Sequence, residues 1–243
     1  ETVVRSFKEV YEHLFKAMYR SLYKSDMPEG LRCVSKTVLE TEFFPELHNM
    51  FPDLKFVYVL RNPYAHFVST VKSMKTHTGR HKSRTNREGM KLHWFKDPYP
   101  FLGPELQRMT RSYYFMRKFA ALYPERFYIL VYDDLIMNPE QEMRNLCRFL
   151  DIDFDPVLLR PTIHGTPWGG NSWSNESFTA IDSKPLHQWK KEISKREIRL
   201  LNKHFGSLID TYFSGENAGG SLFIPFQPSE YKPWVYLGNR ILF

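Results

Sequence analysis

Lys36, Arg61 and Tyr132 each stand at or just beyond the carboxyl end of a predicted strand. In an open parallel α/β sheet these ends share one edge, and ligands bind just outside it. Two cations and an aromatic ring on one edge suit an anionic ligand that carries a ring. The sequence therefore predicts a nucleotide-like ligand at this edge.

Arg61 has the clearest local context of the three. It leaves a strongly apolar strand and precedes a helix whose start is marked by Asn62 as N-cap and Pro63 at the first helical position. Free N–H groups at a helix N-terminus favour an anion, and a guanidinium fork matches phosphate oxygens. Ser69 lies about two turns into the helix, so its hydroxyl could reach the same phosphate. From spacing alone an alternative stays open, in which Arg61 pairs with a carboxylate and Ser69 only packs.

Strands and helices must alternate to place these residues. β-Branched and aromatic runs predict buried strands over 55–60 and 127–132, and a shorter strand is predicted over 31–34. Apolar spacing and capping signals predict helices over 6–24, 42–50, 63–75, 104–123, 139–150 and 194–212. This alternation predicts an α/β fold with a mainly parallel sheet flanked by helices on both faces.

The remaining segments are predicted to be irregular. Residues 75–103 are polar and basic and are expected to form a long excursion outside the core, and 161–185 is predicted to be a loop. Residues 214–243 are expected to be an irregular extension of one domain that covers 1–243. The basic excursion could recruit an anionic acceptor or simply be solvated.

Composition limits the function classes. The net charge of +7 and the pI near 9.3 indicate either a solubilising surface or an anionic partner. Nucleic acid is disfavoured because the basic residues do not alternate with stacking aromatics. Cys33 and Cys147 lie in segments predicted to be a buried strand and helix, which argues against a disulfide framework or a zinc site. No apolar run approaches the roughly 18–20 residues that span a bilayer.

Residues 55–69 resemble the 3′-phosphate-binding segment of the PAPS-dependent sulfotransferase family, where PAPS is 3′-phosphoadenosine 5′-phosphosulfate. The shared features are a hydrophobic strand, an Arg-Asx-Pro sequence and a serine six residues after the proline. The resemblance implies that Arg61 and Ser69 hold the 3′-phosphate. It also implies a P-loop-NTPase-like sulfotransferase architecture.

Two further segments resemble the family in the same order. Residues 127–139 are similar to its Tyr-Glu-Asp-Leu strand with a following proline, which places Tyr132 near the adenine. Residues 164–172 resemble its glycine-rich loop, and 186–197 resemble the region after it. The loop residues implied to close over the nucleotide are His164, Gly165, Trp168, Gly170, Asn171 and Ser172. Trp168 could stack on the adenine or anchor the loop. The resemblance covers about residues 31–213.

The residues that would carry out the transfer are less fully identified than those that would bind the nucleotide. Lys36-Thr37 resembles the Lys-Thr pair whose lysine points toward the transferred group, so Lys36 is the expected electrophilic residue. Val38 stands where the phenol and steroid enzymes place a catalytic histidine. Glu9 and Glu12 are candidates for an upstream carboxylate base, and the base remains unassigned. His66 and His164 are expected to be structural or ligand contacts.

The resemblance implies transfer of a sulfuryl group from PAPS to a hydroxyl or amine, with PAP, adenosine 3′,5′-bisphosphate, as product and no metal required. The acceptor classes left open are carbohydrates, lipids, peptides and small natural products, and an anionic acceptor is one of the possibilities. Residues 1–35 contain no match to the family's 5′-phosphosulfate loop, so a truncated enzyme is expected. A non-catalytic nucleotide- or glycan-binding module is the alternative. A P-loop kinase is disfavoured because its Gly-x-x-x-x-Gly-Lys-Ser/Thr loop is missing.

The two cysteines are too few to indicate the redox state of the cellular compartment in which the protein works. A cytoplasmic location is favoured, and the Golgi lumen is the alternative if an N-terminal anchor has been lost.

Overall fold

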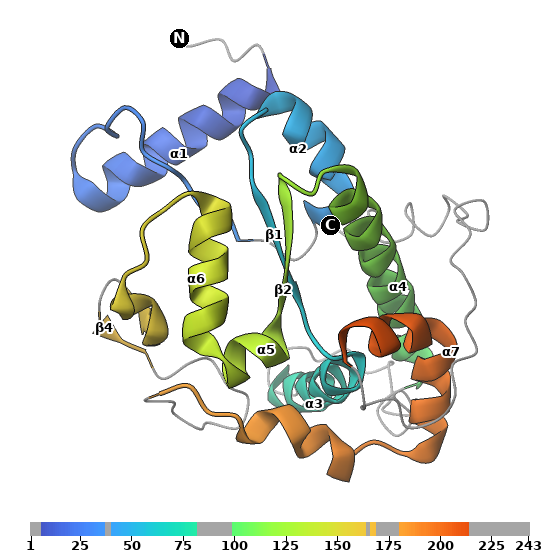
Figure 1. Cartoon of the computed structure of the whole chain (residues 1–243). Helices are drawn as coiled ribbons and strands as arrows, with labels where there is room; N and C mark the ends of the chain where they lie inside the picture. Colours follow the sequence, from blue (N-terminus) through green and yellow to red (C-terminus); the bar gives the residue numbers. More distant parts are fainter. Residues whose placement is uncertain (1–5, 37–39, 82–98, 164–165, 169–179, 214–243) are drawn as a thin grey trace.

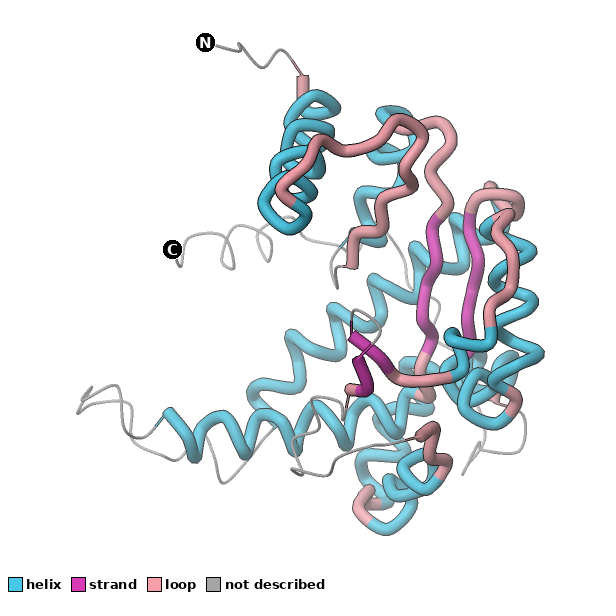
Figure 2. The backbone as a smooth tube through the Cα atoms, turned by 90° about the vertical axis from the view of Figure 1, so that its left-hand side faces the viewer, coloured by secondary structure: helices cyan, strands magenta, loops and turns pink. Residues whose placement is uncertain are grey.

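Two parallel strands form the centre of the computed structural model, which describes residues 6–36, 40–81, 99–163, 166–168 and 180–213. Strand β1 (Phe56–Leu60) pairs with β2 (Phe127–Val131), and Leu60 is opposite Val131 in the register. Figure 2 shows the two strands running side by side. Both strands were predicted, and so was their parallel pairing. Val59 is 55% exposed, so the expected burial of β1 on both faces is wrong at this position.

Helices lie on both sides of this strand pair (Figure 1). Helix α4 (Tyr99–Leu122) and helix α6 (Pro139–Leu150) both contact β2, and Figure 1 places them on opposite sides. The short helix α5 (Tyr132–Met137) begins at the end of β2 and was not predicted. The arrangement confirms the α/β fold class.

The other elements lie around this centre. They are α1 (Phe7–Tyr23), η1 (Glu40–Phe43), α2 (Phe44–Met50), α3 (Pro63–His81), η3 (Pro156–Leu159), β3 (Thr162–Ile163), β4 (Thr166–Pro167), η4 (Lys184–Lys191) and α7 (Lys195–Tyr212). Helices α3 and α4 extend into the segment 75–103 that was predicted to be an excursion, and residues 82–98 lie outside the described part. The β3–β4 hairpin and η4 lie in or beside the predicted loop 161–185. Residues 214–243 lie outside the described residues.

An aromatic cluster around Phe44 forms the core on the α4 side of the sheet. Phe44 is fully buried, with ring centroids 5.5 Å from Phe56, 5.0 Å from Phe119 and 5.4 Å from Phe127. These rings join α2, both strands and α4, so they fix the sheet against its helices.

The segment 31–34, predicted to be a strand, is not one. It is extended chain without a strand partner among the described residues, and Val34 is 91% exposed. Arg32 donates to the carbonyl oxygens of Leu150 and Asp151 at the C-terminus of α6, so this segment lies against a helix end. Cys33 is exposed, contrary to prediction, whereas Cys147 is buried in α6 as expected.

Candidate functional site

The carboxyl ends of β1 and β2 bring Arg61 and Tyr132 together. Because Leu60 and Val131 are opposite each other, the residues that follow them, Arg61 and Tyr132, leave the sheet at the same edge. The guanidinium carbon of Arg61 lies 5.5 Å from the centroid of the Tyr132 ring. This is the distance range of a cation–π contact. Two of the three groups expected at this edge are therefore neighbours.

Arg61 is half-buried at the N-terminus of α3, and no carboxylate among the described residues forms an ion pair with it. Burial of a cation is costly unless an anion or a polar group compensates it. The alternative in which Arg61 pairs with a nearby carboxylate therefore has no support in the described part of the chain. The local arrangement suits an anionic ligand.

Asn62 builds the helix start that lies next to Arg61. Its Oδ1 accepts the backbone N–H of Tyr64 at 2.9 Å, and its carbonyl oxygen accepts the N–H of His66. The predicted cap at Asn62 is therefore confirmed. It fixes the first turn of α3, and the positive end of the helix dipole lies beside the guanidinium.

Ser69 lies on α3 about two turns beyond Asn62 and is half-buried. Its hydroxyl has no hydrogen-bond partner among the residues that the structure describes, so it is available to a ligand. Its role at a 3′-phosphate stays a prediction.

Lys36 is not brought to the edge by a strand. It is exposed, and it follows an extended segment where the sequence predicted a strand ending at Val34. The prediction that three strand ends converge is therefore wrong for Lys36. A strand needs a hydrogen-bonding neighbour, which this segment lacks in the described structure. The electrophilic role of Lys36 stays a prediction.

Most of the predicted glycine-rich loop lies outside the described residues. This applies to His164, Gly165, Gly170, Asn171 and Ser172. Trp168 is described, and it is 40% exposed with its backbone N–H bonded to the Pro161 carbonyl oxygen at 3.0 Å. Both roles that the resemblance leaves to Trp168, stacking on the adenine and anchoring the loop, stay predictions.

Glu42 is the described carboxylate with a clearly raised pKa. Burial raises its pKa, and the opposing attraction of Arg111, 2.5 Å away, is the smaller effect. Glu42 belongs to η1, which packs on α4. The ion pair therefore joins these two elements on the α4 side of the sheet. Glu9 and Glu12, the carboxylates that the sequence suggested as bases, lie on α1.

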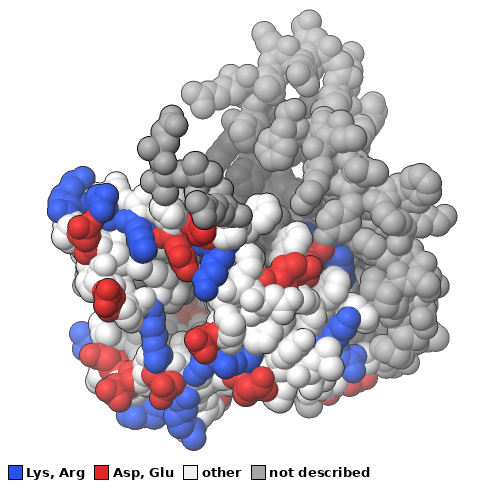
Figure 3. Space-filling model, turned by 90° about the horizontal axis from the view of Figure 1, so that it is seen from above, with Lys and Arg blue, Asp and Glu red and all other residues white. Residues whose placement is uncertain are grey.

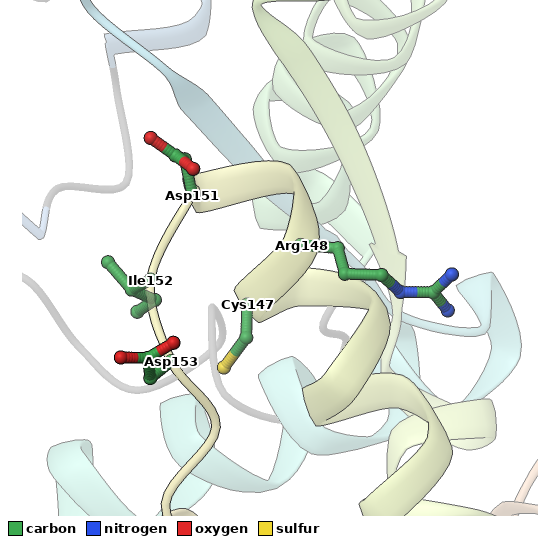
Figure 4. A pocket seen from close by; sticks show the side chains of 5 residues that line it. All are labelled: Cys147, Arg148, Asp151, Ile152 and Asp153. Carbon is green, nitrogen blue, oxygen red and sulfur yellow. The ribbon is translucent and has the colours of Figure 1, made fainter.

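A cavity of about 350 Å³ lies at the C-terminus of α6, lined by Cys147, Arg148, Asp151, Ile152 and Asp153 (Figure 4). In Figure 4 the Arg148 side chain points away from the Cys147 sulfur. Lys55, just before β1, donates to Phe149 in the last turn of α6. The cavity is therefore at the amino ends of the strands, opposite Arg61, where α/β folds do not usually bind their ligands.

Figure 3 shows no patch of one charge among the described residues on its face. Basic and acidic side chains are interspersed there. This fits the solubilising interpretation of the positive net charge for that face. None of the described helices is long and apolar enough to span a membrane. Within the same residues no cluster of histidine, cysteine and acidic side chains could hold a metal ion.

Comparison with known proteins shows the family of this chain. Residues 3–156 match the model of the Sulfotransferase family. The chain belongs to the sulfotransferase family. The match contains Arg61, Ser69 and Tyr132, and it ends before the glycine-rich loop.

Related sulfotransferases are found among curated proteins and solved structures. An omega-hydroxy-beta-dihydromenaquinone-9 sulfotransferase occurs in Mycobacterium bovis and in Mycobacterium tuberculosis. Each is 25% identical over 171 residues, which cover 68% of this chain and 37% of the relative. The chain thus spans little more than a third of these relatives' length.

Two solved sulfotransferase domains have the same fold. The domain from the curacin biosynthetic pathway gives a TM-score of 0.51 at 20% identity, covering 81% of this chain and 66% of that domain. The domain from the Synechococcus PCC 7002 olefin synthase gives 0.50 at 17% identity, covering 77% and 58%. At these identities the likeness concerns the fold alone.

Proposed function

We propose that this chain binds PAPS at the carboxyl edge of β1 and β2 and transfers its sulfuryl group to a hydroxyl group of an acceptor. The observation that carries the proposal is the position of the Arg61 side chain. This side chain is a half-buried cation at a strand end and a helix start, and it has no carboxylate partner in the described structure.

The described residues fit the adenosine end of this donor. A 3′-phosphate would give Arg61 the anion that it lacks, and the Ser69 hydroxyl would add a hydrogen bond from α3. The Tyr132 ring lies beside the guanidinium and offers an apolar face to an adenine. The chemistry of the residues at this edge thus matches a phosphorylated nucleoside.

The chemistry assigned to the chain is in-line transfer. PAPS supplies a sulfuryl group whose bond to the 5′-phosphate breaks, and the acceptor oxygen loses its proton to a base. Negative charge grows on the leaving phosphate, so a lysine beside it stabilises the transition state more than the ground state. Lys36 is our candidate for this role, and its exposure means that it must approach the bound donor.

We infer a hydroxyl acceptor on a hydrophobic small molecule. The mycobacterial relatives are named for an omega-hydroxylated dihydromenaquinone. Among the acceptor classes that the sequence left open, this supports a hydroxyl-bearing natural product over a carbohydrate or an amine.

Titration calorimetry with PAP tests the donor site. Wild type should bind PAP more tightly than adenosine 5′-phosphate, and Arg61→Ala should weaken PAP binding about 10- to 150-fold, the loss expected for hydrogen bonds to a charged group. Arg126→Ala is the matched control. Arg126 lies just before β2, at the opposite end of the strand, and interacts with Asp53. Equal affinities of wild type and Arg61→Ala would refute the site.

A transfer assay separates an enzyme from a nucleotide-binding module. Labelled PAPS is incubated with the chain and with a panel of hydroxylated quinones and simple alcohols, and labelled sulfate ester is measured. Binding of PAP without transfer to any acceptor would favour the module.

A further inference from the structure

A group of buried polar and aromatic side chains, which we call the brace, begins one residue after Arg61. It consists of Asn62 and Tyr64 at the start of α3, Trp189 in η4 and Asn202 in α7. Each of these side chains is at most 4% exposed. The Tyr64 hydroxyl donates to Asn202 Oδ1, and the Tyr64 ring stacks on the Trp189 indole with centroids 4.6 Å apart. The brace therefore ties the first turn of α3 to two elements that come more than a hundred residues later.

The composition of the brace is unusual for a contact that serves burial alone. Polar groups reduce the stabilisation that apolar residues would give at the same place. Two donors of the brace, the side-chain amide of Asn62 and the indole N–H of Trp189, have no acceptor within the described structure. By contrast, Leu201, Phe205 and Leu208 of α7 pack by apolar contact. Apolar contacts allow packed helices to take several relative positions, whereas a directional hydrogen bond between them favours one position.

The position of the brace connects it to Arg61 and Ser69, the two residues proposed to hold the 3′-phosphate, which we call the clamp. Asn62 follows Arg61 directly, so the backbone that carries the guanidinium is fixed by the braced turn. Further along α3, Lys72 forms an ion pair with Glu192 at 2.6 Å, just after η4. Ser69 lies between these two links. Ser69 therefore belongs to a stretch of α3 that is tied at one end to η4 and α7 and at the other end to the residue after η4, and Arg61 precedes this stretch.

We propose that Tyr64, Trp189 and Asn202 are positioning residues for the 3′-phosphate clamp. They act through Arg61 and Ser69 and do not touch the nucleotide. The inference rests on the proposed function, because it assigns the brace to recognition of one phosphate. Their loss should reduce the preference for nucleotides with a 3′-phosphate more than it reduces nucleotide binding in general.

The measurement is the ratio of calorimetric affinities for PAP and adenosine 5′-phosphate, which we call the 3′-phosphate preference. Tyr64→Phe removes only the hydroxyl, and Asn202→Leu removes its acceptor. Each should lower the preference about three- to tenfold, the effect of one hydrogen bond on an affinity. Trp189→Phe keeps a ring that can stack and should retain the preference, whereas Trp189→Leu should lose it.

Leu208→Ala is the structural control. Leu208 is a buried α7 residue about two turns beyond Asn202, so its loss destabilises the core without touching the brace. It should lower the melting temperature and leave the preference unchanged. If Tyr64→Phe keeps the wild-type 3′-phosphate preference, the inference is overturned and the proposed function still stands. A wild-type protein without any preference would overturn the proposed function and the inference together.

Discussion

Replacing Tyr132 by leucine tests how the Arg61 side chain is held. The structure places the Tyr132 ring 5.5 Å from the guanidinium carbon, whereas the sequence resemblance expects the same tyrosine near the adenine. Both roles use the face of the ring and not its hydroxyl. They are separated in the Arg61→Ala background, where only the contact between the ring and the guanidinium is lost.

The expected magnitude follows from the burial of the pair. Cation–π contacts contribute about 0.5–1 kcal/mol at exposed sites and about 2 kcal/mol when desolvated. Both residues are half-buried, so we expect a loss of about 1–2 kcal/mol in Tyr132→Leu. This corresponds to a roughly 5- to 30-fold weaker affinity for PAP.

The assay is titration calorimetry on wild type, Tyr132→Leu and Tyr132→Phe, with Tyr128→Leu as control. Tyr128 is a half-buried tyrosine of β2, the strand that ends just before Tyr132, and its ring packs on Phe149. Tyr132→Phe should bind PAP within about twofold of wild type because the ring is kept. In the Arg61→Ala background the cost of Tyr132→Leu should shrink, since the cation is gone. Equal losses in Tyr132→Phe and Tyr132→Leu would show that the hydroxyl is the important group and would refute the reasoning.

Two further predictions concern stability. Ser194→Ala should lower the free energy of unfolding by about 1 kcal/mol in urea titrations, because Ser194 and Glu197 form a capping box at the start of α7. Ser207→Ala, inside the same helix, is the control and should lower it much less. Burial, and then the charge of Lys203, lower the pKa of His204 from its usual 6.5, so the folded ring holds fewer protons than the unfolded one. This contribution to stability is present above the unfolded pKa and is lost as pH falls through about 6.5 toward the folded value. Urea unfolding at about pH 8 and about pH 5.5 should therefore differ less in His204→Gln than in wild type, and an unchanged difference would exclude this residue as its source.

The elements with strong local signals were predictable from sequence. The apolar runs of β1 and β2, the Asn62-Pro63 start of α3 and the capping box of α7 all depend on neighbouring residues. The segment 31–34 lacked such support. Its side chains suit a strand, but a strand forms only where a second strand satisfies its hydrogen bonds, and the described chain offers this segment a helix end instead.

The candidate site was predictable only for the residues that directly follow a predicted strand. Arg61 and Tyr132 could be placed together because parallel strands share one edge. The bond between Tyr64 and Asn202 spans 138 positions and leaves no periodic or motif signal. That Arg61 forms no ion pair with a carboxylate among the described residues is likewise a property of the folded chain, because many acidic residues could in principle have reached it.

The region that supports the clamp extends beyond the part of the chain that identifies the family. The family match ends at residue 156, and both η4 and α7 follow it. Yet Trp189, Leu201 and Phe205 belong to the same buried cluster as Tyr64 of α3 and Met116 of α4. Without η4 and α7 the apolar faces of α3 and α4 would be exposed, and the turn that carries Arg61 would lose its brace. The part of this chain that holds the proposed clamp in place therefore includes η4 and α7, together with Phe213 at the end of α7.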